Sequence, residues 1–279
     1  MKLILSRKGF DSGSGGGPSP ILPDGTMVSL PIPEPLGQLG GACAYRDIGV
    51  NNQWTMESLA TTLGVKPSNL ENGAHLDPDL VPQARPRQPG WKASFGQSGA
   101  ASGHLTNQAV GVGDLFIFWG LFRHTIYQDG NLRWDNAREP FHAVFGWLQV
   151  EQQIDPSAHA APAWAHDHPH VAVPWRKSNQ LYIARTNGPF GLRGAGVLNW
   201  RPELQLTCPA SPKTLWRLPE NCHPDSTGAT LSYHSDTTRW TKQSGSTLLQ
   251  TVARGQEFVV DATPAWLDWA KSLLTSSAS

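Results

Sequence analysis

The stretch Gly113-Asp114-Leu115-Phe116-Ile117-Phe118-Trp119-Gly120 sets five apolar side chains in a row between turn-forming residues. A short, fully apolar run bounded in this way is typical of a strand buried on both faces. Residues 142–150, which include Val144, Trp147 and Leu148, predict a second buried strand. We therefore expect a sheet whose centre is formed by these two segments.

The sequence on either side predicts shorter elements. Strands are expected at residues 2–6, 180–184, 196–199, 204–207 and 258–260, and helices at 56–63, at 98–108 and from Thr263 onward. Residues 18–36 and 152–178 are rich in proline and predict extended or loop structure. No repeat or linker divides the chain. The prediction is one α+β domain over residues 1–279, with a mostly antiparallel or barrel-like central sheet, long loops and a C-terminal helix.

The composition limits the classes of function. The 22 basic and 22 acidic side chains balance, so polyanion binding would need a local patch rather than a global field. Three cysteines without a CxxC pair argue against a disulfide framework and a structural zinc site. The apolar residues after Met1 are too few for a signal peptide, and no stretch is long enough to cross a membrane. We expect a cytoplasmic protein that does not bind membranes.

A glycine-rich loop follows the first predicted strand. Arg7, Lys8, Gly9 and Asp11 lead into the glycines at 13–17. Because backbone amides without side chains can approach an anion closely, and Arg and Lys supply counter-charge, these residues predict a site for phosphate or a nucleotide. The segment fits neither the P-loop nor the dinucleotide motif, since prolines follow the glycines and no helix can begin there. A Gly/Ser/Pro turn after an edge strand is the alternative.

Histidines gathered with carboxylates predict a metal site. His75 and Asp77 alternate in sequence and would share one side of an extended backbone, as would His168 and His170. Imidazole and carboxylate ligands suit a divalent metal such as iron or zinc. The alternatives are a turn in which Asp77 caps the backbone before a proline, and a polar loop around His168.

Four further polar residues are candidates for a role in the same site. His104 and His142 stand alone beside apolar elements, where a core role is the usual one, and they would be catalytic if they met the other histidines. Asn179 and Gln256 stand near the ends of short strands, from which they could bind a nucleotide base or satisfy the strand ends. A Ser/His/Asp nucleophilic site is set aside, because no GxSxG motif occurs.

The order of these segments resembles a family described as nucleotide modification-associated domain 3. The resemblance rests on residues 5–12, 18–25, 30–33, 75–79, 95–97, 113–120, His142 with 145–148, 168–170, Asn179 with Tyr182, and 255–259. It implies an association with DNA base modification in bacteria and phages, and no particular reaction or catalytic residue. Separately, residues 113–120 with 145–148 are similar to PUA-like barrels such as EVE and ASCH domains, which hold a modified or flipped base in an aromatic pocket.

Three functions are therefore weighed. The first is an enzyme that modifies or processes nucleotides or bases in DNA, assisted by a metal at the His/Asp-rich site. The second is a non-catalytic reader of modified bases, similar to PUA and EVE domains. The third is a metal-dependent oxidase or hydrolase that acts on a small metabolite or peptide. For the first two, the partner is a nucleotide or a DNA base.

Overall fold

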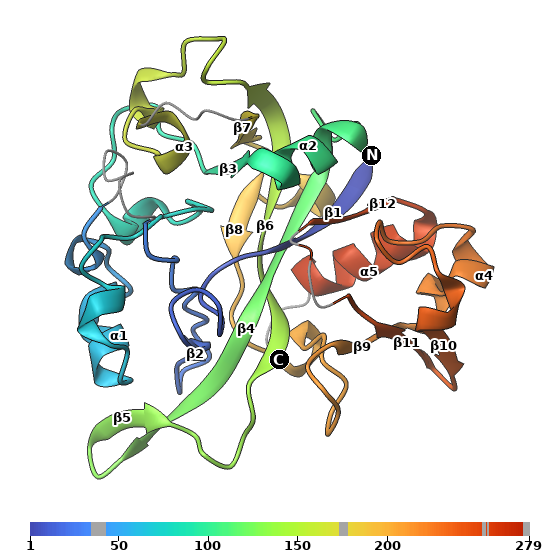
Figure 1. Ribbon diagram of the computed structural model, residues 1–279, viewed down its shortest axis with the longest axis horizontal. Helices are drawn as coiled ribbons and strands as arrows, with labels where there is room; N and C mark the ends of the chain where they lie inside the picture. The colour runs from blue at the N-terminus through green and yellow to red at the C-terminus, as the bar shows by residue number, and fades with distance from the viewer. Residues whose placement is uncertain (35–42, 173–177, 253–254, 256, 276–279) are drawn as a thin grey trace.

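Two long antiparallel strands cross the molecule and carry the other elements (Figure 1). The computed structural model describes residues 1–34, 43–172, 178–252, 255 and 257–275. The long strands are β4, Leu115–Gln128, and β6, Phe141–Ile154. Both of the apolar segments expected at the centre of the sheet are there, and each strand is longer than its apolar core.

A nine-stranded mixed sheet forms around this pair. Its main path runs β12 (Glu257–Asp261), β1 (Lys2–Arg7), β4, β6, β7 (Asn179–Ala184) and β3 (Ser94–Ser98). Off this path, β2 (Ser19–Ile21) and β5 (Asn131–Trp134) pair with β4, and β8 (Ala195–Val197) pairs with β6. Only the pairs of β4 with β1 and β2 are parallel among the described strands, so the mostly antiparallel sheet is confirmed.

The sheet curls without closing into a barrel. Within the described residues, the hydrogen-bonded path ends at β12 on one side and β3 on the other. Side chains bridge the two ends, because Gln97 Nε2 of β3 donates to Glu257 Oε1 of β12 at 2.5 Å. The open but curved sheet brings chain segments from both of its edges close to one place.

β4 continues past Gly120, the residue at which the sequence pattern predicted its end. Glycine is required there by close packing, since a Cβ at this position would lie 2.6 Å from the backbone oxygen of Lys8. The strand then turns into β5 through Asp129 and Gly130, whose φ angles of 54° and 77° suit a two-residue hairpin turn. Gly120 therefore marks a close approach of two chain segments and not a strand end.

A smaller sheet and a C-terminal helix form the other side of the molecule. This three-stranded sheet has the order β10 (Trp240–Gln243), β11 (Ser246–Gln250) and β9 (Leu215–Pro219). Helix α5, Pro264–Thr275, buries Trp266, Trp269, Leu273 and Leu274. This is the C-terminal helix that the sequence predicted.

The remaining helices are short. α1 (Met56–Thr62) begins with a capping box between Thr55 and Ser58, and α2 is Gly99–Asn107. Figure 1 shows α1 and α5 on opposite sides of the β4–β6 ribbon. Two one-turn helices are α3 (Pro169–Ala172) and α4 (Pro224–Thr227). Single 3-10 turns cover Tyr45–Asp47, Pro67–Asn69, Pro82–Ala84, Ala163–Ala165, Pro189–Gly191, Pro202–Leu204, Glu220–Cys222 and Thr237–Arg239.

The strand expected at residues 204–207 is absent from the described structure. Leu204 ends the 3-10 turn that Pro202 begins, and Gln205 and Thr207 make only isolated bridges, to Ala143 and Trp216. Proline at the first position sets φ for a turn, which here outweighs the apolar alternation that suggested a strand. Strands β2, β3, β5, β9, β10 and β11 lie outside the strands that the sequence predicted.

We expect Gly120→Ala to lower the free energy of unfolding by about 1–3 kcal/mol, because the new methyl group would press on the backbone of Lys8. Equilibrium urea unfolding would measure the change. Gly103→Ala is the control, since a Cβ at that position in α2 meets nothing within 4 Å. Alanine also favours a helix, so this variant should be neutral or slightly stabilised. Equal behaviour of the two variants would contradict the close packing of β4 on Lys8.

Candidate metal centre

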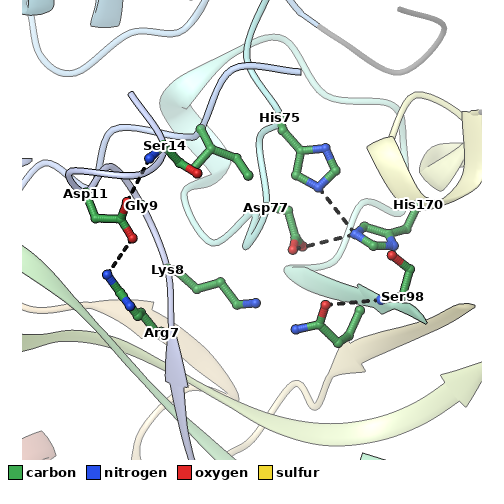
Figure 2. Close-up of a pocket in the computed structure, with 11 residues that line it drawn as sticks. Arg7, Lys8, Gly9, Asp11, Ser14, His75, Asp77, Ser98 and His170 are labelled. Carbon is green, nitrogen blue, oxygen red and sulfur yellow. Dashed lines mark hydrogen bonds and ion pairs between the residues drawn. The ribbon is translucent and has the colours of Figure 1, made fainter. Parts of the chain in front are cut away.

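A polar cavity of about 210 Å³ opens where several distant chain segments meet. Its wall combines the N-terminal loop, residues of β3 and α3, and the segment after Ala74 (Figure 2). The lining residues are Arg7, Lys8, Gly9, Asp11, Ser14, Ile32, His75, Asp77, Gln97, Ser98 and His170. The glycine loop and the His/Asp segments, which the sequence singled out separately, therefore share one cavity.

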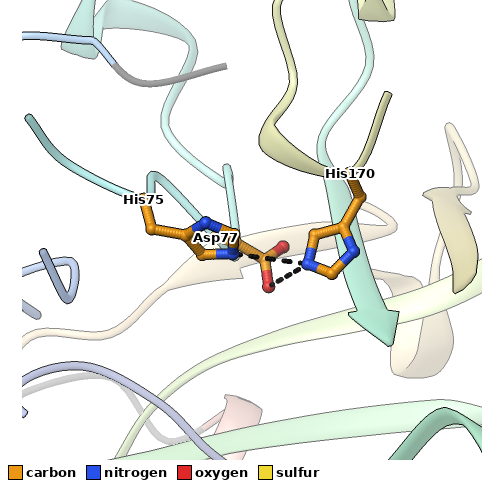
Figure 3. Close-up of side chains that lie close together, drawn as sticks. All are labelled: His75, Asp77 and His170. Carbon is orange, nitrogen blue, oxygen red and sulfur yellow. Dashed lines mark hydrogen bonds and ion pairs between the residues drawn. The ribbon is translucent and has the colours of Figure 1, made fainter. Parts of the chain in front are cut away.

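Three of these side chains form a group that could hold a metal ion. One ligand atom each from His75, Asp77 and His170 lies within 4.8 Å of the others (Figure 3). Asp77 is fixed by Gly96, whose N–H donates to its Oδ1 at 2.7 Å. The same glycine makes room for His170, since a Cβ at Gly96 would lie 2.2 Å from that ring.

Hydrogen bonds behind the two histidines set which ring nitrogen faces the group. His75 Nδ1 lies 2.8 Å from Glu34 Oε2. His170 Nδ1 lies 2.7 Å from Asn179 Oδ1, and Asn179 Nδ2 donates to the backbone oxygen of His170, which fixes the orientation of the amide. Each Nδ1 therefore carries the hydrogen, and in the neutral form of each ring the Nε2 carries a lone pair. This is the arrangement in which metal-binding histidines are usually held.

The two Nε2 atoms face one another at 3.3 Å. Two lone pairs at that distance repel each other unless a cation or a proton lies beside them. Burial lowers the pKa of His170 to about 3, and His75 adds to the effect, so the ring is neutral at physiological pH. A metal ion beside both Nε2 atoms would relieve such a repulsion, because neutral imidazole is the form that binds metals.

The charges around the cavity also favour a cation. Asp11 and Asp77 line it, and Glu34 and Glu257 lie directly behind its wall. Lys8 and Arg7 are the fixed positive charges among the lining residues. Burial raises the pKa of Asp77 to about 6, an effect that Lys8 and His75 oppose. The two lining carboxyl groups match the two lining cations, and Glu34 and Glu257 behind the wall add negative charge that a divalent ion could offset.

His168, which the sequence grouped with the metal ligands, lies just outside this group of three. Its Nδ1 accepts a hydrogen bond from the backbone N–H of His170 at 3.2 Å, so its Nε2 carries the hydrogen. That Nε2 lies 3.6 Å from Asp77 Oδ1, and the ring is buried. Burial holds the pKa of His168 well below its usual range. At this distance His168 Nε2 makes no hydrogen bond with Asp77, and the role of His168 as a metal ligand stays a prediction.

The glycine loop satisfies its own amides. Asp11 Oδ1 accepts hydrogen bonds from Gly13 N–H at 2.6 Å and Ser14 N–H at 2.8 Å, and Asp11 Oδ2 pairs with Arg7 at 2.5 Å. The loop amides and the Arg7 side chain are the groups from which the sequence predicts a phosphate site. Asp11 therefore shapes the loop in this structure, and its carboxylate occupies the position of an anion.

Lys8 is the cation best placed inside the cavity. Figure 2 shows it extending between Arg7 and the His–Asp group. Its Nζ lies 3.3 Å from Glu257 Oε1 and 4.3 Å from the centre of the Phe95 ring, and its side chain is 9% exposed. Gly9 beside it has a φ of +80° and a Cβ there would meet Ser29, so the backbone fits only glycine.

The other predicted site residues lie apart from this cavity or behind it. His142 is buried against Trp119 and Trp216, and Trp216 Nε1 donates to its Nδ1 at 3.1 Å. His104 lies on α2, where its Nε2 is 2.9 Å from Ser232 Oγ. Asn179 supports His170 from behind, as described above. Gln256 lies outside the described residues.

Sequence reasoning did not assign three residues that the site uses. Glu34 supports His75 from 41 positions away, and no local pattern marks it beyond a carboxylate in a proline-rich segment. Gln97 and Glu257 stand in segments that the sequence analysis noted, yet their contact joins positions 160 apart. Only the fold brings these pairs together.

The fold and the site define an α+β protein with a two-histidine, one-carboxylate group in a polar cavity. The chain belongs to the family described as nucleotide modification associated domain 3, whose model matches residues 2–261. The resemblance noted in the sequence is thereby confirmed. No curated protein and no solved structure gives a significant match. None of the described helices has the length and apolar character needed to span a bilayer.

A pH dependence of stability follows from the burial of His142. Burial lowers its pKa to about 3, so the folded protein leaves this ring neutral while the unfolded chain protonates it below about pH 6.5. Stability should therefore fall as the pH falls, by about 2 kcal/mol between roughly pH 7 and roughly pH 5 from this residue alone. Urea unfolding of the wild type and His142→Gln, both with a chelator, would isolate the contribution. Equal slopes for the two proteins would contradict it.

Proposed function

We propose that the protein is a metal-dependent enzyme that modifies or processes a nucleotide or a base in DNA, with His75, Asp77 and His170 as the metal ligands. The observation that carries the proposal is the pair of Nε2 atoms 3.3 Å apart beside Asp77, each ring held by a partner on its other nitrogen. Two oriented imidazole nitrogens beside a carboxylate are an arrangement that a bound cation would stabilise.

The ligand set favours a catalytic ion over a structural one. Structural zinc sites are closed by four protein ligands, whereas three ligands leave positions for water or substrate. Two histidines and one carboxylate are used by iron in oxygenases and by zinc in hydrolases. Iron or zinc is accordingly the proposed cofactor. Iron in the site would indicate oxidation, and zinc would indicate hydrolysis.

The nucleotide as substrate is supported by the family and by the cations of the same cavity. The family name associates this domain with nucleotide modification. Lys8 and Arg7 line the cavity together with the ligand group, so a phosphate could meet positive charge while the base or sugar lies beside the metal. Both cations have a carboxylate partner, and Lys8 is the better candidate because it extends toward the His–Asp group (Figure 2).

A non-catalytic reader of modified bases is less well supported. Such a reader needs an aromatic cage, and the described residues that line this cavity include no Phe, Tyr or Trp. Where a reader would have aromatic rings, this cavity has the potential metal ligands His75, Asp77 and His170. We therefore favour the enzyme over the PUA-like or EVE-like reader.

The first test is the metal content of the protein purified without a histidine tag or chelator. We expect about one equivalent of iron or zinc, since a site with oriented ligands retains its ion. His75→Ala should lose most of it, because one of three ligands is removed. Elemental analysis by mass spectrometry measures both.

His166→Ala is the control, since His166 lies in the histidine-rich segment of His170 but has an exposed side chain. It should keep the full metal content. Protein without metal, or equal metal in the wild type and His75→Ala, would sink the proposed centre. Stoichiometric metal without any affinity for nucleotides or DNA would instead point to a small metabolite or peptide as substrate.

A second test addresses the support behind His170. Asn179→Ala removes the acceptor for His170 Nδ1–H and should weaken metal affinity by about 10–100-fold. Asn179→Asp keeps an acceptor oxygen in place and should retain much of the affinity. Competition against a chromophoric chelator gives the dissociation constants. An unchanged affinity in Asn179→Ala would show that this hydrogen bond does not orient a ligand.

A further inference from the structure

A second hollow lies behind one wall of the metal cavity. Its volume is about 370 Å³, and its lining residues are Ser98, Ala100, Ala101, His104, Tyr233, Gly255 and Glu257. Ser98 lines both spaces. Glu257 contacts Gln97 and Lys8, which line the metal cavity, so a single layer of side chains separates the two.

An aromatic pair forms part of this second hollow. The rings of His104 and Tyr233 are stacked, with centres 4.4 Å apart and planes 29° apart. Tyr233 is 52% exposed, so its ring is accessible to a ligand. The small side chains of Ala100 and Ala101 beside it leave room for a flat molecule to approach.

The backbone holds Tyr233 outward under strain. Its φ is 67°, a left-handed conformation that is uncommon for a bulky residue and carries a cost in free energy. Both neighbours are anchored. Ser232 N–H donates to Val259 O, and Ser232 Oγ accepts from Val259 N–H. His234 is fully buried, and its Nε2 accepts a hydrogen bond from Val252 N–H.

His104, the other ring of the pair, is anchored as well, because its Nε2 lies 2.9 Å from Ser232 Oγ. The two rings are therefore held in place before any ligand binds. Tyr233 is exposed, yet one face of its ring packs on His104. Strain that the surroundings impose in this way is commonly found at binding sites.

We propose that the His104–Tyr233 pair is a stacking platform for a nucleobase next to the one at the metal cavity, so that the substrate is a short single strand and not a free nucleotide. The inference rests on the proposed function. Because Ser98 lines both spaces, a strand whose reacting nucleotide occupies the metal cavity would bring its neighbouring base to the second hollow over the edge that Ser98 forms. Stacking on a tyrosine accepts any base, because every base has a flat π-face.

The balanced charge of the chain agrees with this limited contact. A long nucleic-acid footprint needs many phosphate contacts from Lys and Arg, and the chain has no excess of them. One cavity and one stacking position would bind two or three nucleotides. Aromatic stacking supplies affinity that does not depend on charge.

Titration calorimetry with two probes tests the platform: deoxyadenosine monophosphate and the trinucleotide of deoxyadenosine. The wild type should bind the trinucleotide more tightly. Tyr233→Ala should weaken trinucleotide binding by about tenfold or more, while changing mononucleotide binding less than about twofold. Tyr233→Phe keeps the ring and should behave as the wild type. Tyr127→Ala is the matched control, since Tyr127 is 50% exposed on β4 and lines neither hollow.

The outcomes separate this inference from the proposed function. Loss confined to the trinucleotide in Tyr233→Ala supports the platform. Equal binding of both probes by the wild type and Tyr233→Ala overturns the platform and leaves the metal enzyme standing. Failure of the wild type to bind either probe overturns the platform together with the nucleotide substrate. Thermal unfolding of each variant would show that the fold is kept.

Discussion

The buried carboxylate of Glu257 is the contact on which the arrangement of the site depends. Its Oε1 accepts hydrogen bonds from Ser6, Lys8 and Gln97, residues that belong to β1, to the loop after it and to β3. Burial raises the pKa of Glu257, and these donors and the charge of Lys8 oppose the shift. Removing such a carboxylate would leave a buried lysine without its partner. One side chain thus holds both edges of the curved sheet and the cation of the cavity.

The group of His75, Asp77 and His170 also depends on chain segments that are distant in the sequence and meet in the fold. His75 follows a bridge between Ala74 and the proline-rich segment, while His170 stands on a one-turn helix against β3. Each ring is aimed by a polar residue from yet another part of the chain. Buried polar side chains cost free energy unless they are satisfied, so a fold that gathers this many in one place has a chemical reason to keep them.

The sequence predicted the parts of this site better than their arrangement. Alternation alone placed His75 and Asp77 on one side of an extended segment, and the structure agrees. His168 alternates with His170 in the same way, yet a helical turn begins at Pro169 and only His170 belongs to the group of three. The sequence predicts Asp11 in a phosphate site, and no local pattern indicates that its carboxylate accepts hydrogen bonds from Gly13 and Ser14 of the same loop. Short-range patterns identify residue types, whereas tautomers and partners depend on contacts across the whole chain.

The same limit applied to the fold. Apolar runs located the centre of β4 and β6, but Gly120 was taken as a strand end because the backbone that presses on it belongs to Lys8, far away in sequence. The short strands β3 and β9 are fixed by their pairing and carry little alternation of their own. The C-terminal helix was predictable, since its tryptophans and leucines repeat at helical spacing.

The separation of the ligands along the chain has a thermodynamic consequence. His75 and His170 are 95 residues apart, so an ion held between them would close a long loop of the polypeptide. Binding energy at such a cross-link adds to the stability of the native state in proportion to the logarithm of the free ion concentration. The resistance of the native state to unfolding, and with it to proteolysis, would then vary with the supply of the ion.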